Sequence, residues 1–120
     1  MKNPRPVRWM GDSLDAVRAF PEEVQKDMGD DLQVAQYGGY PASAKPFKGV
    51  GSGVYELAER YDKEAYRVVY AVKIDDHVYV LHAFHKKSKS GISTPKKDVD
   101  MIKRRYNEAV ADAAERKKKG

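Results

Sequence analysis

Three strand-length segments at hairpin spacing constrain the fold of this chain more than any other feature of its sequence. Val54–Arg60, Ala65–Lys73 and His77–His85 are rich in β-branched and aromatic residues, and short polar links separate them. We expect Tyr61–Glu64 to connect the first two segments and Asp75–Asp76 to form a tight turn between the last two. The spacing therefore predicts an antiparallel sheet.

A short strand and two helices are expected before this sheet. Pro6–Met10 predicts the strand, and a first helix should cover Ser13–Phe20, with Asp12 as its N-cap and Asp15 as the capping partner. A second helix should begin at Pro21, where a missing N–H is harmless. That helix has one apolar face and ends at two glycines: Val24, Met28, Leu32 and Ala35, then Gly38 and Gly39.

The last segment predicts a C-terminal helix with Thr94 as its N-cap and Pro95 at the first helical position. Apolar residues repeat at three and four residues along one side: Val99, Ile102, Tyr106, Ala109 and Ala113. This order of elements indicates an α+β fold. With 120 residues, we expect one domain over residues 1–114 and a basic, disordered tail over residues 115–120.

The positive charge of the chain is concentrated at its C-terminal end. Residues 86–120 hold 12 Lys and Arg against 5 Asp and Glu, a net of +7, whereas residues 1–85 hold 11 against 13, a net of −2. Clustered cations displace the counterions of a phosphate backbone, so this asymmetry favours a nucleic-acid partner. A solvated basic helix is the alternative interpretation.

Other compositional features narrow the class of protein. The chain has no cysteine, which fits a reducing cytoplasm, and its first residues carry neither a secretion signal nor an apolar run that could cross a membrane. We predict no metal site, because His77, His82 and His85 alternate in facing and no carboxylate has a suitable spacing beside them. Phosphate-binding and nucleophile-elbow motifs are absent from the sequence.

The alternation of side chains predicts which residues face a ligand. In two strands the bulkier face includes Tyr66, Val68 and Tyr70, and Val78, Val80, His82 and Phe84. If this face packs under the helices, His82 is a core residue, and Arg67 and His85 both point to the opposite, open face.

Several short motifs, in this order, resemble those of the RelE/HigB superfamily of bacterial toxins, in particular its phage-related Gp49-like branch. They are PFKG around Lys48, GVYELAER at 53–60, YRVVYAVK at 66–73, HAFHKKSKS at 82–90 and TPKKD at 94–98. The resemblance spans about Val7 to Ala109. It implies a small, twisted, mainly antiparallel sheet with helices on one side and the active site on the other.

The resemblance also implies a function. The family consists of toxins of type II toxin–antitoxin systems, which cleave mRNA, commonly on the ribosome, and are neutralised by a helix-turn-helix antitoxin. The motifs match Arg67, Lys48 and the strand-ending His85, Lys86 and Lys87 to the catalytic positions. We expect RNA-backbone contacts from the remaining cations: Lys89, Lys96, Lys97, Lys103 and Arg104.

RNA cleavage can proceed at such a site without a metal or cofactor, because the 2′-hydroxyl of RNA is the nucleophile. Arg67 would clamp the phosphate, and the lysines would stabilise charge or transfer a proton. The general base stays open between His85 and a lysine, since many relatives have Gln at the position of His85. Tyr106 is a weak counterpart of the C-terminal catalytic tyrosine of RelE, because its spacing indicates core.

Structural roles and other functions remain as alternatives. Arg67 could simply pair with Glu56 or Glu59 across the sheet, His85 could be a solvated strand end, and Lys86 with Lys87 could protect an edge. The protein could also be a non-catalytic, phage-derived module that binds nucleic acid or a partner, or a phage assembly component.

Overall fold

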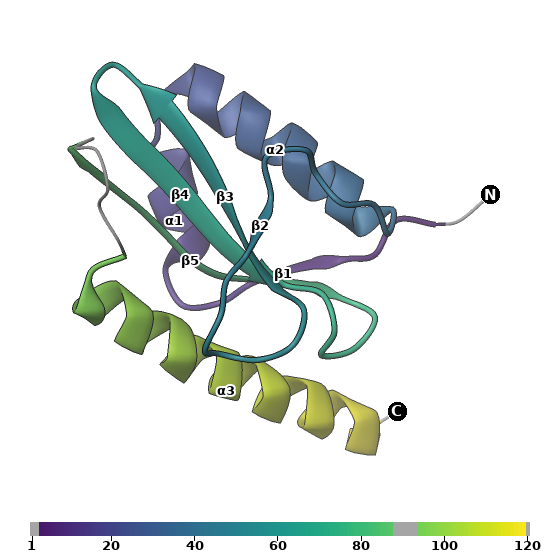
Figure 1. Cartoon of the computed structure of the whole chain (residues 1–120). Coiled ribbons are helices and arrows are strands. Elements are labelled where there is room, and N and C mark those ends of the chain that lie inside the picture. The colour runs from purple at the N-terminus through teal and green to yellow at the C-terminus, as the bar shows by residue number, and fades with distance from the viewer. Residues whose placement is uncertain (1–2, 88–93, 120) are drawn as a thin grey trace.

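A five-stranded mixed sheet in the order β1-β5-β4-β3-β2 forms the centre of the computed structural model, which describes residues 3–87 and 94–119 (Figure 1). Only β1 and β5 pair in parallel, and the other neighbours are antiparallel. The predicted α+β fold and its three main strands are confirmed. The strands are β1 Val7–Trp9, β2 Lys45–Pro46, β3 Val54–Tyr61, β4 Glu64–Ala71 and β5 Val78–Lys87.

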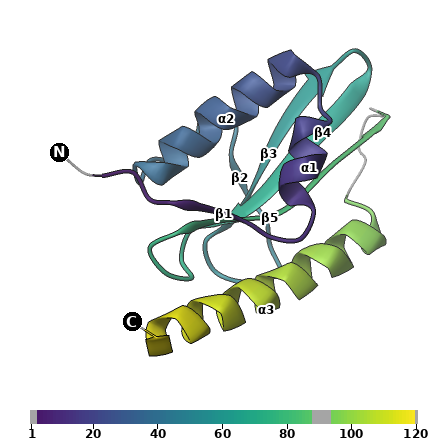
Figure 2. The ribbon, with the colours of Figure 1, turned by 180° about the vertical axis from the view of Figure 1, so that it is seen from behind.

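Helices cover both faces of this sheet. α1 (Ser13–Arg18) and α2 (Glu22–Gln36) lie on one face, and Figure 2 shows α1 in front of the strands. α3 (Lys96–Lys119) lies on the other face, where the family resemblance implied an uncovered surface. Any ligand on this second face must therefore bind beside α3.

The core under α2 forms as the sequence predicts. Val24, Met28, Leu32 and Ala35 are all buried against the sheet. Val24, Met28 and Leu32 each contribute roughly 1.5–3 kcal/mol by leaving water, and the smaller Ala35 side chain contributes less. The helix ends at Gln36, and Gly38, two residues beyond, has a φ of +84°, which favours glycine.

Two connections between the strands differ in kind. Asp62 and Lys63, with φ of 48° and 66°, form a two-residue turn between β3 and β4, within the predicted link. The tight turn predicted at Asp75–Asp76 is wrong, because residues 72–77 form a longer loop. Its carbonyl groups turn toward one guanidinium: Arg5 Nη2 donates to the oxygens of Val72 at 2.7 Å and Asp75 at 2.8 Å.

A β-bulge in β5 changes which residues share a face. Val69 pairs with His82 but Tyr70 pairs with Val80, which leaves Leu81 as an extra residue. Beyond the bulge, the alternation of side chains is shifted by one position.

The predicted facing of β5 is therefore wrong for its second half. His82 and Phe84 lie on the α3 face with Arg67, whereas His85 pairs with Tyr66 and lies on the face of α1 and α2. Arg67 and His85 do not share a face. The bulge supplies the physical reason, because one inserted residue reverses a period of two.

Two predictions about helix ends also need correction. Asp12 occupies the N-cap position of α1 but makes no side-chain capping hydrogen bond, because its carboxylate binds Arg105 instead. α3 continues through Lys119, so residues 115–119 are helical where we expected a disordered tail. Pairs four residues apart, including Asp112 with Arg116, support this last part of the helix. No helix among residues 3–87 and 94–119 is long and apolar enough to cross a membrane.

Candidate functional site

Three cations from three neighbouring strands lie on one face of the sheet, beside α3. The strand register places Ala58, Arg67 and Phe84 in one row across the sheet, and Arg60, Ala65 and Lys86 in the next row. We call Arg60, Arg67 and Lys86 the basic strand face. Their neighbours in these rows, Ala58 and Ala65, have small side chains. Bulky residues therefore do not separate the cationic side chains there.

Arg67 is the most enclosed of these cations. Its Nη1 donates to the two carboxylate oxygens of Glu56 at 3.3 and 3.4 Å, which are long distances for a charged pair. Its Nε is buried and has no hydrogen-bond partner within the described part of the chain. The cross-strand pairing with Glu56 that the sequence left open is therefore present, but it leaves part of the guanidinium without a bond.

His85 is held on the opposite face by an aromatic contact and an ion pair. Its ring stacks on Tyr66 with the centroids 5.2 Å apart, and its Nδ1 lies 3.1 Å from a carboxylate oxygen of Glu64. Half of the side chain, 51%, is exposed. The strand alternation puts Lys87 on this same face and Lys86 on that of Arg67.

The other predicted site residues are distributed around the molecule. Lys48 is exposed in the loop between β2 and β3, and Lys89 lies outside the described residues. Lys96, Lys97, Lys103 and Arg104 are exposed on α3, as expected for its basic side. Lys96 pairs with Asp100 at 2.8 Å, and this hydrogen bond raises the pKa of the Lys96 ammonium.

A buried chain of charged groups attaches the first half of α3 to the sheet, and sequence reasoning missed it. His82 Nε2 lies 2.8 Å from a carboxylate oxygen of Asp98, and His82 Nδ1 lies 3.2 Å from Arg105 Nη1. Arg105 also donates to the Leu81 carbonyl at 3.1 Å and to Asp12 at 2.7 Å. Because the Arg105 guanidinium can only donate, His82 Nδ1 accepts and Nε2 carries the proton.

Burial shows that these contacts are structural. Arg105 is only 5% exposed and Asp98 8%, and the hydrogen bond from Arg105 lowers the pKa of the Asp12 carboxyl. We had expected His82 in the apolar core, and the bulge places it here instead. Sequence spacing carries no sign of this contact, since the participating residues come from three separate segments: the start of α1, β5 and α3.

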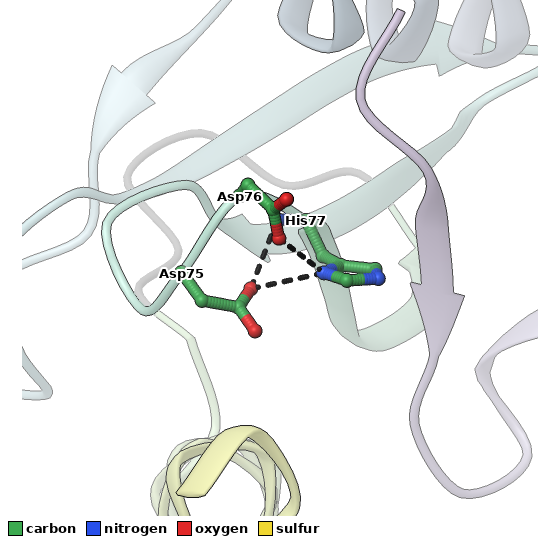
Figure 3. Close-up of side chains that lie close together, drawn as sticks. All are labelled: Asp75, Asp76 and His77. Atoms are coloured by element: carbon green, nitrogen blue, oxygen red, sulfur yellow. Dashed lines mark hydrogen bonds and ion pairs between the residues drawn. The ribbon is translucent and has the colours of Figure 1, made fainter. Parts of the chain in front are cut away.

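A second polar cluster holds the last half of α3 against the loop between β4 and β5 (Figure 3). His77 Nδ1 lies 3.2 Å from Asp75 Oδ1 and 2.9 Å from Asp76 Oδ1. Arg116 Nη2 donates to Asp75 Oδ2 at 2.6 Å and also to the Tyr79 hydroxyl. Burial would raise the pKa of Asp75, but hydrogen bonds from His77 and Tyr79 lower it overall.

This cluster corrects one argument about metals. Two carboxylates do lie beside His77, although we expected none at a suitable spacing. The Arg116 guanidinium already neutralises the Asp75 carboxylate, which makes that carboxylate a poorer ligand for a cation. We therefore assign to the cluster the role of attaching α3. Next to it, an open groove of about 830 Å³ is lined in part by Tyr106 and Val110. Tyr106 packs within the cluster under α3 rather than beside Arg67.

Acidic groups gather on the side away from the basic strand face. Glu59 of β3 lies beside Asp27 of α2, with Glu23 and Asp31 nearby. Burial, followed by the hydrogen bond and negative charge of Asp27, raises the pKa of Glu59 to about 7. The two sides of the sheet thus have opposite electrostatic character.

A model of a known protein family matches most of the chain. The family model described as "Phage derived protein Gp49-like (DUF891)" matches residues 15–107. That span runs from α1 into α3. It includes the four residues other than alanine in the Arg67 and Lys86 rows, which are Arg60, Arg67, Phe84 and Lys86, and also Glu56, the partner of Arg67. A search of curated proteins found no match.

Proposed function

The chain belongs to the Gp49-like family of phage-derived proteins, and from this premise we propose that it is the toxin of a type II toxin–antitoxin system and cleaves mRNA. The family points to a module related to toxin–antitoxin systems. The activity, the partner and the site residues are the proposed part.

The observation that carries the proposal is the incompletely bonded guanidinium of Arg67 on a cationic sheet face. The Arg67 side chain is 19% exposed, and a planar guanidinium suits a phosphate, which can accept two parallel hydrogen bonds. Arg60 and Lys86 in the adjacent row add positive charge beside it. A face of this kind favours a polyanion over a neutral small substrate.

The cleavage step needs only groups of the RNA and of this face. The 2′-hydroxyl oxygen attacks the adjacent phosphorus, and the bond to the 5′-oxygen of the next nucleotide breaks. A cyclic 2′,3′-phosphate and a 5′-hydroxyl are the products. Arg67 stabilises the charge on the phosphate oxygens, and Lys86 protonates the leaving 5′-oxygen.

We assign the general base to Glu56, a residue that the sequence suggested only as a partner of Arg67. Its carboxylate lies against the Arg67 guanidinium on the proposed phosphate-binding face, and its side chain is 15% exposed. The carboxylate takes the proton of the 2′-hydroxyl as that oxygen attacks. His85 was the earlier candidate, but its ring faces the other side of the strand.

Partners follow from the same proposal. The cations of α3 next to this face, including Lys97, Lys103 and Arg104, would bind the RNA backbone on both sides of the cut. We propose that the mRNA is cut on the ribosome and that a helix-turn-helix antitoxin neutralises the toxin. The competing function is a nucleic-acid-binding module that uses the same cations without cleavage.

Induced expression with transcript mapping tests the proposal. We expect wild-type protein to arrest growth and produce discrete transcript cuts, and Arg67→Ala to abolish both. Glu56→Gln should slow cleavage about 10²- to 10⁴-fold while RNA affinity stays the same, as for loss of a general base. Lys26→Ala, at an exposed position of α2, is the control that should retain toxicity.

Two results together would overturn the proposed nuclease activity. Cells with folded wild-type protein would grow normally with intact transcripts, and mRNA on purified ribosomes would also stay uncut. Retained RNA binding in that case would favour the non-catalytic module.

A further inference from the structure

Phe84 is an aromatic side chain on the face proposed for RNA, directly opposite Arg67 in the strand register. The ring is partly buried against the cluster under α3 and partly exposed. Lys86 follows it two residues later and shares its face. The ring therefore offers part of its aromatic surface between two cations, Arg67 and Lys86.

We propose that Phe84 forms a stacking site for one unpaired RNA base, next to the phosphate held by Arg67. This inference rests on the proposed function and adds a base-binding position to it. Base stacking on an aromatic side chain accepts every base, because each has a π-face. Residues directly opposite on neighbouring strands are close enough for one nucleotide to place its phosphate on Arg67 and its base on Phe84.

The ring of Phe84 stacks with a second ring on the same face of β5. His82 stacks on Phe84 with the centroids 5.2 Å apart and an interplanar angle of 21°. His82 itself is fixed at both nitrogens, by Asp98 and by Arg105. A base would therefore meet a platform that is already ordered, so little rotamer entropy is lost on binding.

The geometry also indicates the class of RNA. A base in an A-form duplex is stacked on its neighbours and cannot offer its face to a protein ring, whereas an unpaired base can. The stacking site thus selects single-stranded RNA by conformation rather than by sequence. Purines, with the larger π-face, should bind there more tightly than pyrimidines.

A fluorescent RNA analogue tests stacking directly. The probe is a single-stranded oligonucleotide that is 2′-O-methylated throughout, which removes the nucleophile, and contains one 2-aminopurine, whose fluorescence is quenched by stacking. Phe84→Leu should weaken binding about tenfold, or about 1.4 kcal/mol, and abolish the quenching, because leucine has no π-face on which the base can stack. Phe84→Tyr should retain both properties.

Two controls separate stacking from structural damage. Tyr40→Leu removes an exposed aromatic ring on a different part of the surface and should leave affinity and quenching unchanged. The dependence of affinity on salt should be the same in Phe84→Leu and the wild type, since no charge is removed. Thermal unfolding of Phe84→Leu establishes that the variant is folded.

The results separate this inference from the proposed function. If Phe84→Leu binds the RNA probe as tightly as the wild type does, or quenches its fluorescence as strongly, the stacking site is overturned, even if the protein cleaves RNA. Absence of both RNA binding and transcript cleavage in the wild type would overturn the proposed function together with this inference.

Discussion

The two faces of the sheet are attached to their helices by different kinds of interaction. Under α1 and α2 the contacts are mainly apolar, with Met28 and Leu32 deep in the core. Under α3 a smaller apolar cluster around Ile102 is flanked by buried charges, among them Arg105 and Asp98. Apolar contact is tolerant of small shifts, whereas ion pairs and hydrogen bonds require defined geometry.

This difference matters because the proposed RNA face lies beside α3. The polar contacts fix both the helix and the His82 ring in one position, which an apolar interface alone would leave free to slide. On this interpretation the α2 side supplies most of the stability and the α3 side supplies the orientation of the site. The following changes test that division, beginning with the largest expected effect.

Leu32→Ala should cause the largest loss of stability. The side chain is 4% exposed, and removing its methyl groups leaves a cavity under α2. We expect the free energy of unfolding to fall by about 3 kcal/mol in urea denaturation. Gln33→Ala, at the exposed neighbouring position, should change it by less than about 0.5 kcal/mol. A loss below about 1 kcal/mol for Leu32→Ala would mean that the α2 side is not the main source of stability.

Arg105→Met should destabilise the α3 side by a smaller amount. The substitution keeps an apolar side chain of similar length but leaves the Leu81 carbonyl and His82 Nδ1 without their donor. We expect a loss of about 2 kcal/mol. Arg104→Met is the matched control, because Arg104 is exposed and should be replaceable with little change. Equal stability of the two variants would show that the buried charges do not hold α3.

Glu59 should make stability depend on pH on the α2 side. Its folded-state pKa of about 7 lies above the ordinary 4.5, so its contribution to stability is complete below pH 4.5 and is lost as the pH rises through 7. The expected loss between these values is roughly 1–2 kcal/mol, since the carboxyl is only partly buried. Denaturation of the wild type and Glu59→Gln across this range measures it. Identical pH profiles would show that Glu59 ionises normally.

His85→Gln should have the smallest effect, because His85 is on the side opposite Arg67. We expect toxicity and the cleavage rate to stay within about twofold of wild type, with a stability change below about 0.5 kcal/mol. Growth after induction, compared with Arg67→Ala, is the measurement. Loss of cleavage in folded His85→Gln would return the proton-transfer role to the imidazole and contradict the assignment by face.

Much of this fold follows from local sequence rules. The period of two in β3, β4 and β5 and the period of three to four in α2 each depend on neighbouring residues, so their strands and helices could be predicted. The site could be predicted less well. No feature of the sequence around Leu81 indicates the bulge. The bulge nevertheless determines whether His85 or Phe84 shares a face of the sheet with Arg67. The pairing of Arg105 with Asp12 joins positions far apart in the chain.

The bulge also separates residue number from facing in β5, because counting along the strand by twos fails across Leu81. Deleting Leu81 would restore strict alternation with Phe84 still opposite Arg67 and His85 still opposite Tyr66, because the pairs on both sides of the bulge already fit one continuous register. One inserted residue thus changes which residue numbers share a face along the strand. Anyone transferring site residues between relatives by counting along this strand should first establish whether the extra residue is present.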